Sequence, residues 1–398
     1  MPRGSEMGRI LCAWCTLFRR TTDMVHDAGR DATLVKVRKE PRSMIEQLTP
    51  RERIDRFIEE MPKAELHVHL EGAVLPETLL NLARKHNVDL PAQDLAGIRE
   101  FYTFRDFDHF VRVYMKINDC LVTPEDVGLI TEELGNEAAR QNIRYLEVTI
   151  SPGTIVFIHG LTFDELLDEM NAAAERVHKN HGVRMQWVLD VIRDMPPHIR
   201  EAGARFAVSA MDRGIVALGL GGTEAKYPPE QFVDLFSLAR DAGLPSVPHA
   251  GETAGPESIW GALKQLDAVR IGHGVRAIED PELVKYLADN QIPLEISPTS
   301  NMCIGVFDSW ERHPMRELYD AGVPVTVNSD DPPMFNTTLT QEYRELVDRF
   351  GFTVSQLEEI TLNAIKFAFL SESEKTAMAS AFQVEFDQLR QKHGIDVE

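Results

Sequence analysis

The sequence predicts a single (β/α)8 barrel, a TIM barrel, with a lid insertion after the first strand. Eight short apolar runs recur along about 300 residues, and stretches with helical periodicity separate them. Alternating strands and helices of these lengths predict a parallel sheet, and eight such units fit a closed barrel. A doubly wound open sheet is the alternative. It would need a glycine-rich phosphate turn after the first strand, where this chain has His69-Leu70-Glu71-Gly72.

The predicted strands are rich in apolar and β-branched residues and are bounded by turn residues. They are Ala64–Leu70, Tyr145–Ile150, Met185–Ile192, Ile215–Leu220, Pro245–His249, Val269–Val275, Pro293–Ser297 and Val323–Asn328. The predicted helices between them are Pro76–His86, Phe163–His178, Gln231–Ala242, Glu257–Leu266, Pro281–Asp289 and Pro314–Ala321. A further helix is predicted ahead of the first strand, where a capping pattern at Thr49 precedes an apolar stripe.

The connection after the first strand carries a dense group of aromatic residues. More than 70 residues separate the first two strands, and this segment includes Phe101, Tyr102, Phe104, Phe107 and Phe110. Aromatic side chains at this place could form an apolar lid over the barrel mouth, which would exclude water from a site there. The alternative is that they pack an ordinary pair of helices.

The first 45 residues differ from the rest of the chain. Residues 1–42 hold nine Arg or Lys against five Asp or Glu, in a chain whose net charge is -21. Because this segment has no sustained periodicity, we expect a poorly ordered extension over residues 1–45 and a single domain over 46–398. Cys12 and Cys15 lie in that extension, have no second pair at zinc-ribbon spacing and predict no metal or redox site.

Composition limits the partners of the chain. An excess of 63 acidic over 42 basic residues argues against nucleic acid or an anionic membrane as a partner. No apolar run approaches the roughly 18 residues that span a bilayer. The apolar run Ile10–Phe18 is followed by two arginines instead of a cleavage site, so no secretory signal is expected. We expect a cytoplasmic protein that acts on a small molecule, with no indication of its oligomeric state.

His67 and His69 lie on the first predicted strand. Alternate residues on a strand face the same side, so the two imidazoles point together and could form half of a metal site. In a chain with 13 histidines one such pair arises easily by chance. Its position at the carboxyl end of a strand favours a functional site, because barrel enzymes build their active sites at that end.

Three further strands end in residues able to perform chemistry. His249 and Glu252 follow the fifth strand, His273 lies in the sixth, and Asp330 and Asp331 follow the eighth. Each taken alone has an ordinary explanation, a buried structural histidine or an Asp-Asp-Pro turn. Together with the first strand, however, they bring four strand ends with His, Asp or Glu to one face of the barrel, which predicts an active site.

Two or three imidazoles with one carboxylate and an open position describe a catalytic zinc site. Zinc lowers the pKa of bound water from about 15.7 to near 7, so the predicted reaction is hydrolysis, with Glu252 as the acid and His273 as the base. The motifs of other hydrolytic designs, such as H-x-E with P-C-x-x-C or G-x-S-x-G, do not occur. Cys303 with His313 suggests a thiol hydrolase, but no third partner is evident.

Four segments resemble the motif set of the adenosine deaminase family, in the family's order and spacing. They are LHVHLEGA (66–73), HAGE (249–252), IGHG (271–274) and NSDDPPMF (328–335). The resemblance runs from about Met61 to about Glu342. It implies one Zn²⁺ per chain, held by His67, His69, His249 and Asp330.

The resemblance also implies the roles of the remaining residues. His273 would orient and deprotonate the attacking water, and Glu252 would protonate the purine ring nitrogen beside the attacked carbon. Asp331 would hold the hydroxide and a second ring nitrogen, and Gly222 would offer a backbone N–H to the purine. Ammonia would then leave.

The substrate that the resemblance implies is a 6-aminopurine nucleoside, with adenosine or 2′-deoxyadenosine, deaminated to inosine or its deoxy form, expected first. Family members that act on adenosine have an Asp two residues after the second histidine, where it contacts the ribose 5′-hydroxyl. This chain has Glu71 there, and we group Glu71 and His69 with the substrate contacts. Glu71 keeps adenine and 5′-modified nucleosides such as aminodeoxyfutalosine open as alternatives. A non-catalytic zinc-binding barrel is disfavoured because every catalytic residue is present.

Overall fold

Eight parallel strands form one sheet in the order β1 to β8 in this computed structural model, which describes residues 48–104 and 107–396. The strands are β1 (Lys63–His69), β2 (Ile143–Ile150), β3 (Arg184–Ile192), β4 (Ile215–Gly221), β5 (Ser246–Ala250), β6 (Ile271–His273), β7 (Leu294–Ile296) and β8 (Val325–Val327). The extension expected over residues 1–45, with Cys12 and Cys15, lies outside the described residues.

The sheet closes on itself where the end of β8 meets β1. Val68 and Asp330 form a parallel bridge, and the His69 N–H donates to the Asp330 carbonyl at 2.8 Å. The Asp330 N–H in turn donates to the His67 carbonyl at 3.2 Å. The predicted (β/α)8 barrel is confirmed. The backbone bonds that close it also bring Asp330 against the two histidines of β1.

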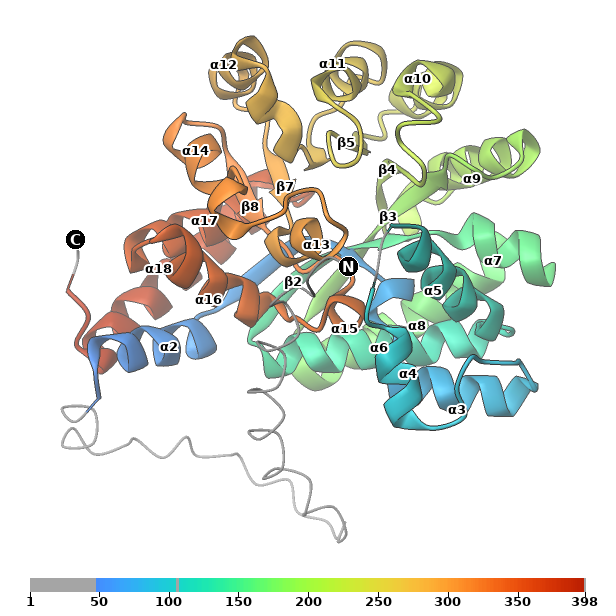
Figure 1. Cartoon of the computed structure of the whole chain (residues 1–398), viewed down its shortest axis with the longest axis horizontal. Coiled ribbons are helices and arrows are strands. Elements are labelled where there is room, and N and C mark those ends of the chain that lie inside the picture. Colours follow the sequence, from blue (N-terminus) through green and yellow to red (C-terminus); the bar gives the residue numbers. More distant parts are fainter. Residues whose placement is uncertain (1–47, 105–106, 397–398) are drawn as a thin grey trace, which may run out of the picture. The chain divides into compact units, whose positions relative to one another are not determined.

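Helices surround the strands and cover the outside of the barrel, as Figure 1 shows for α9 to α12. The α-helices are α2 (Pro50–Glu60), α3 (Pro76–His86), α4 (Leu95–Phe101), α5 (Phe107–Cys120), α6 (Pro124–Arg140), α7 (Pro152–His159), α8 (Phe163–His181), α9 (Pro197–Ser209), α10 (Val233–Asp241), α11 (Pro256–Gln265), α12 (Pro281–Asn290), α13 (Pro298–Cys303), α14 (Met315–Asp320), α15 (Pro332–Phe335), α16 (Leu339–Phe350), α17 (Val354–Phe367) and α18 (Glu372–His393). Short 3-10 turns lie between them: η3 (Glu71–Ala73), η4 (Met211–Arg213), η5 (Pro229–Phe232), η6 (Val275–Glu279) and η7 (Trp310–Arg312).

Each predicted strand and helix has a counterpart within a few residues of its predicted bounds. The helix predicted after Thr49 is α2, and Thr49 caps it in a reciprocal capping box with Glu52. The last three strands are shorter than predicted at both ends. The backbone leaves the extended conformation at the mouth of the barrel after β6 and β8. His273 and Asp330 there have φ angles of 59° and 63°.

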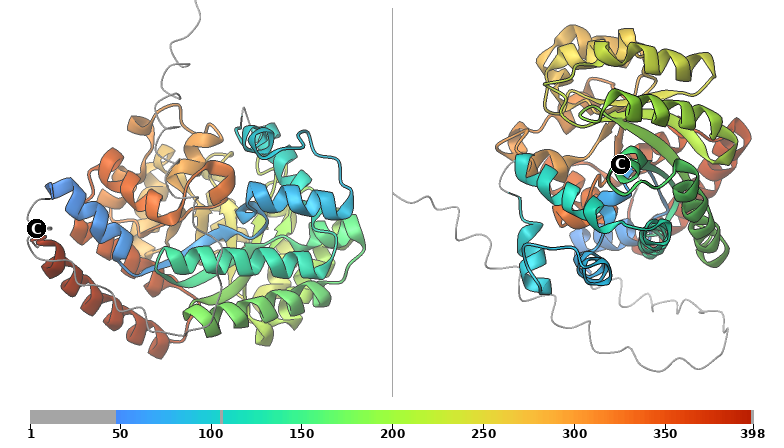
Figure 2. Two further views of the ribbon diagram at one scale, coloured as in Figure 1. Left: turned by 90° about the horizontal axis from the view of Figure 1, so that it is seen from below. Right: turned by 90° about the vertical axis from the view of Figure 1, so that its right-hand side faces the viewer.

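Two helices from opposite ends of the described chain pack together outside the barrel. Figure 2 shows α2, in blue, beside α18, in dark red. Phe57 of α2 and Phe386 of α18 are both fully buried, with ring centroids 6.2 Å apart. Burial of two aromatic rings contributes several kcal/mol at most to the docking of the terminal helix.

The connection between β1 and β2 contains η3 and helices α3 to α6. Phe110 of α5 stacks on Phe335 of α15 with centroids 5.6 Å apart, and Phe104 meets the same ring edge-on at 5.5 Å. Phe104 and Phe110 of the insertion therefore pack against the segment that directly follows Asp331. The lid stays a prediction, since packing alone does not show that α5 opens and closes.

Candidate metal centre and active site

Side chains from β1, β5 and the end of β8 converge at the carboxyl end of the barrel. His69 Nε2 lies 3.1 Å from His249 Nε2, and Asp330 Oδ1 lies 3.3 Å from His69 Nε2. The same carboxylate oxygen lies 3.5 Å from His67 Nε2. Atoms about 2.0–2.2 Å from one zinc ion at tetrahedral angles would lie roughly 3.3–3.5 Å from each other. Three distances among the four expected ligands are thus close to this spacing. His67, His69 and Asp330 form one group of possible ligand atoms within 4.8 Å of one another, and His249 forms another group with His67 and His273.

Hydrogen bonding leaves the inward nitrogen of His67 available for a metal. Its Nδ1 pairs with Glu295 Oε2 at 2.9 Å, and Glu295 Oε1 is held by Arg270 Nε at 2.6 Å. Metal-binding histidines usually donate their second ring N–H to such a carboxylate, which fixes the tautomer. Neither residue was expected from the sequence, because Glu295 lies within β7 and Arg270 directly before β6, where spacing gives no signal.

A second carboxyl group that the sequence analysis missed lies behind His249. Asp190 of β3 is buried, and its Oδ2 is 3.7 Å from His249 Nδ1. Side chains at Gly219 or Gly221 would collide with it, since their Cβ atoms would lie 1.9 and 2.4 Å from its oxygens. The two glycines of β4 carry no side chain, which leaves room for the Asp190 carboxyl group beside the His249 ring.

Burial would lower the pKa of His67, but hydrogen bonds with Asp330 and Glu295 outweigh it and raise the pKa well above its usual value. Burial determines the protonation of the other three histidines at the centre. It lowers the pKa of His69 to about 3 and that of His273 to about 4, and it holds the pKa of His249 well below its usual value. These rings are therefore neutral at physiological pH, which is the form that binds a metal or accepts a proton. For Asp330, burial would raise the pKa, but the hydrogen bond with His67 outweighs it and keeps the carboxyl ionised.

His273 is held on the side of the cluster that faces the predicted acid. Its Nε2 lies 3.5 Å from Glu252 Oε1 and 3.8 Å from Asp330 Oδ2. Its Nδ1 pairs with Asn301 at 3.2 Å, and Asn301 pairs with His313, whose Nδ1 accepts from the Met315 N–H. The relay fixes the ring of His273. It also occupies both nitrogens of His313, so the thiol hydrolase alternative with Cys303 gains no support.

Glu252 and Asp331 present two carboxyl groups to the same cavity. Burial raises the pKa of both well above the usual carboxyl range, and the charge of Asp330 raises them further. Each could therefore carry a proton at neutral pH. Asp331 packs directly on Gly72 of η3, where a Cβ would lie 1.6 Å from its Oδ1. This contact explains why a glycine follows Glu71 in the first motif.

Gly222 lies at the cavity wall after β4, with a φ of 94°. A Cβ there would lie 2.8 Å from an oxygen of Asp194, so glycine lets the backbone lie against Asp194, another residue of the cavity lining. Glu71 instead lies behind the wall. Its Oε1 accepts the Ser151 N–H at 2.8 Å and its Oε2 accepts the Tyr114 hydroxyl at 3.2 Å. Tyr114 and Ser151 line the cavity.

The cavity has a volume of about 280 Å³. Its polar wall contains most of the residues singled out from the sequence: His69, Gly222, His249, Glu252, His273, Asp330 and Asp331. The apolar part of the lining consists of Phe110, Val111, Met115, Ile192, Met195, Ile304 and Phe335. A cavity with an apolar lining and a few polar groups suits a flat heterocycle with polar edges.

Fold and site together define a metal-dependent hydrolase of the (β/α)8 barrel class. Comparison with known proteins then specifies the family. The family model described as adenosine deaminase matches residues 62–384. The chain belongs to the adenosine deaminase family. It is therefore a deaminase, a hydrolase that acts on carbon–nitrogen bonds.

Two relatives and one solved structure illustrate which members of this family the chain is similar to. Aminodeoxyfutalosine deaminase of Streptomyces avermitilis is 39% identical over 81% of this chain and 91% of its own length. Adenine deaminase of Rhizobium meliloti is 38% identical over 81% of this chain and 99% of its own. An amidohydrolase of Burkholderia ambifaria, solved with bound zinc, is 27% identical, with 88% and 96% coverage and a TM-score of 0.79.

These comparisons support a metal cofactor and a small purine-type substrate. They leave the particular compound open, because the relatives carry different substrate names. Among the helices of the described residues, none is long and apolar enough to cross a membrane.

Proposed function

We propose that the chain is a zinc-dependent deaminase of a 6-aminopurine, with His67, His69, His249 and Asp330 as the ligands of one zinc ion. The distances of 3.1 to 3.5 Å among their inward atoms carry this proposal. When bound, zinc supplies a hydroxide nucleophile at neutral pH. A relative of this fold that was solved with bound zinc supports the identity of the metal.

The chain's own residues bind the purine and move the protons. Glu252, whose pKa is raised by burial, donates its proton to the ring nitrogen beside the attacked carbon, which makes that carbon electrophilic. His273, neutral because burial lowers its pKa, takes up the proton of the attacking water and passes it to the amino group, which leaves the ring as ammonia when the carbon–nitrogen bond breaks. Asp331 and the backbone N–H of Gly222 hold the other polar edge of the ring. The apolar wall with Phe110 and Ile304 excludes bulk water from its face.

The position of Glu71 favours a nucleoside with a modified 5′ end over adenosine itself. Its two carboxylate oxygens already accept bonds from Ser151 and Tyr114, so they are not directed at the cavity. A ribose 5′ end would meet the Tyr114 hydroxyl and the Ser151 backbone instead of a free carboxylate. A relative named aminodeoxyfutalosine deaminase, 39% identical, supports this choice.

Adenine is the second candidate, favoured by the relative named adenine deaminase at 38% identity. Adenosine, expected first from the sequence, remains compatible with the purine contacts.

The test is a panel of adenosine, 2′-deoxyadenosine, adenine and aminodeoxyfutalosine, followed by the loss of 6-aminopurine absorbance. The proposal predicts the highest kcat/KM for aminodeoxyfutalosine, about tenfold or more above adenosine. Highest activity on adenine would replace the substrate but keep the reaction. Inactivity on all four compounds would refute 6-aminopurine deamination.

A further inference from the structure

One buried carboxylate holds the loop that carries Glu252. Glu224 is 2% exposed and lies in the connection after β4. Its Oε1 accepts the Gly251 N–H at 2.6 Å, and its Oε2 accepts the N–H groups of the next three residues. Those bonds measure 3.2 Å from Glu252, 2.8 Å from Thr253 and 2.9 Å from Ala254. A single side chain thus satisfies four consecutive backbone donors.

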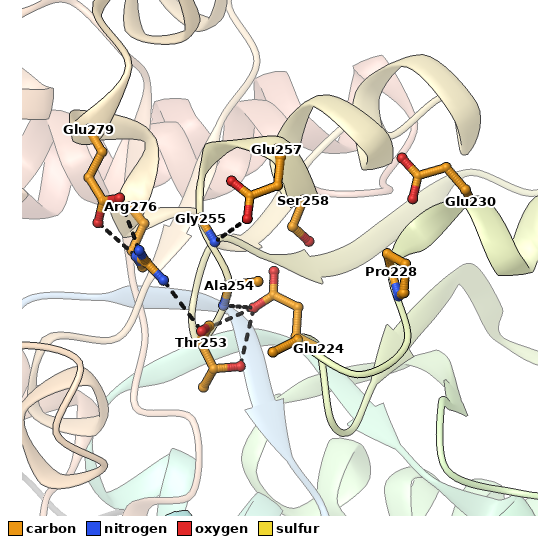
Figure 3. Close-up of a pocket in the computed structure, with 11 residues that line it drawn as sticks. Glu224, Pro228, Glu230, Thr253, Ala254, Gly255, Glu257, Ser258, Arg276 and Glu279 are labelled. Carbon is orange, nitrogen blue, oxygen red and sulfur yellow. Dashed lines mark hydrogen bonds and ion pairs between the residues drawn. The ribbon is translucent and has the colours of Figure 1, made fainter.

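Arg276 holds carbonyl groups of the same loop. Its backbone N–H donates to the Gly251 carbonyl at 3.0 Å, and its Nη1 donates to the Thr253 carbonyl at 3.4 Å. Its guanidinium is fixed in turn by Glu279 at 2.7 Å. Figure 3 shows Glu224 and Arg276 bonded to Thr253 and its neighbour. Glu224 therefore accepts hydrogen bonds from the N–H groups of the loop, and Arg276 donates hydrogen bonds to its carbonyl groups.

The loop needs these anchors because its own backbone makes no helix or strand. Gly251 turns the chain with a φ of 71°, and residues 251–254 are bends between β5 and α11. Charge-assisted bonds from N–H groups to a carboxylate are about twice as strong as neutral ones. Without the bonds to Glu224, the four backbone N–H groups of the loop, which are buried or half-buried, would lack a fixed acceptor. The direction of the Glu252 side chain would then vary.

Glu224 also ties the loop to the other purine contact in the proposed site. It lies two residues after Gly222 in one connection, whose Thr223 N–H is fixed by Asp194 Oδ2 at 2.8 Å. Glu224, which binds the loop, therefore belongs to the same backbone segment as Gly222, which lines the purine cavity.

We propose that Glu224 is a positioning residue for deamination, which sets the distance between the proton donor Glu252 and the ring contact at Gly222. This inference rests on the proposed role of Glu252. Glu224 does not touch the substrate cavity and acts through the loop backbone. A displacement of about 1 Å at a reacting group can cost about 100-fold in rate, so the effect is expected in kcat.

The first variant is Glu224→Gln, which keeps the size of the side chain but points an amide donor at the backbone donors. We expect kcat to fall about 10- to 100-fold, KM to change less than about threefold, and bound zinc to stay the same. The matched control is Glu257→Gln. Glu257 and Glu224 both line a second pocket, separate from the purine cavity (Figure 3). Among the described residues Glu257 accepts one backbone N–H, that of Gly255 at 3.2 Å, so removing its charge should change kcat less than about twofold.

A double variant separates positioning from general support of the fold. If Glu224 acts through Glu252, Glu224→Gln should cost less than about threefold in a Glu252→Gln background. A further tenfold loss in that background would overturn the inference. So would a Glu224→Gln enzyme with kcat within threefold of the natural one.

Amide hydrogen exchange gives a readout that needs no activity. Glu224→Gln should speed exchange of residues 251–254 about tenfold or more, without change in β1. Equal or uniformly faster exchange would contradict the anchoring. If the natural chain deaminates none of the panel compounds, the proposed function fails, while exchange still decides whether Glu224 holds the loop. If Glu224→Gln does not fold, Glu224→Asp takes its place, because it shortens the side chain by one methylene. Its kinetics, its effect in the Glu252→Gln background and its amide exchange are then measured.

Discussion

His69 Nε2 and His249 Nε2 lie 3.1 Å apart, although 180 residues separate the two histidines in the sequence. Burial lowers the pKa of both rings, that of His69 to about 3, so neither is charged near neutral pH. Two neutral imidazoles whose nitrogens point at the same place, with the ionised Asp330 3.3 Å away, form a site for a cation.

Glu295 should set the affinity of the site for zinc. It accepts from His67 Nδ1 at 2.9 Å and so directs the other nitrogen of that ring inward. We expect Glu295→Gln to weaken zinc binding about 10- to 100-fold, measured by competition with a chromogenic chelator. Unchanged affinity would show that His67 is oriented by packing alone.

Glu252 should be needed for turnover and not for the metal. Glu252→Gln has nearly the same shape but cannot donate the carboxyl proton, so kcat should fall about 100- to 10,000-fold. Zinc content, measured by plasma emission, should match that of the unchanged chain. A variant that turns over normally would mean that another group protonates the purine.

Phe110 of α5 should contribute to substrate binding. It lines the cavity and stacks on Phe335, whose helix follows Asp331 directly. We expect Phe110→Ala to raise KM about tenfold or more and to change kcat less, because the ring covers the purine without reacting. The matched control is Phe163→Ala. Phe163 stacks on Phe206, and neither residue lines this cavity. Equal kinetics for Phe110→Ala and the unchanged chain would argue against a lid.

Acid should weaken the contact between α2 and α18. Burial alone would raise the pKa of Glu60, but hydrogen bonds from His393 and Lys392 outweigh it and lower the pKa to about 2. A depressed carboxyl pKa stabilises the fold above its unfolded value near 4.5, and this contribution disappears as the pH falls toward about 2.

Because Glu60 is one third exposed, its contribution should be about 1 kcal/mol or less. In urea unfolding, Glu60→Gln should therefore be less stable than the unchanged chain at pH 6, with a smaller difference at pH 3. A difference that stays constant with pH would assign the effect to packing.

Much of the barrel was predictable because its signals are local. The apolar runs of the strands and the caps of the helices, such as Thr49 on α2, arise from neighbouring residues. The clustering of His67, His69, His249 and Asp330 was predictable because parallel strands bring their carboxyl ends to one face.

The supporting residues were not predictable in this way. Glu295 lies in β7 and Arg270 directly before β6; both are buried, and nothing in their spacing distinguishes them from core positions. Glu224 bonds to a loop 27 to 30 residues away, which only the folded chain reveals. Glu71 shows the same limit, since its partners Tyr114 and Ser151 come from two later elements.

The most direct test of the account is a zinc titration of the metal-free chain. Chelator-treated protein receives increasing zinc while ammonia release from the best panel compound is followed. We predict no turnover without metal, a linear rise that ends at one zinc per chain, and no recovery for Asp330→Ala. Full turnover by the metal-free chain, or by Asp330→Ala, would contradict the proposed zinc centre.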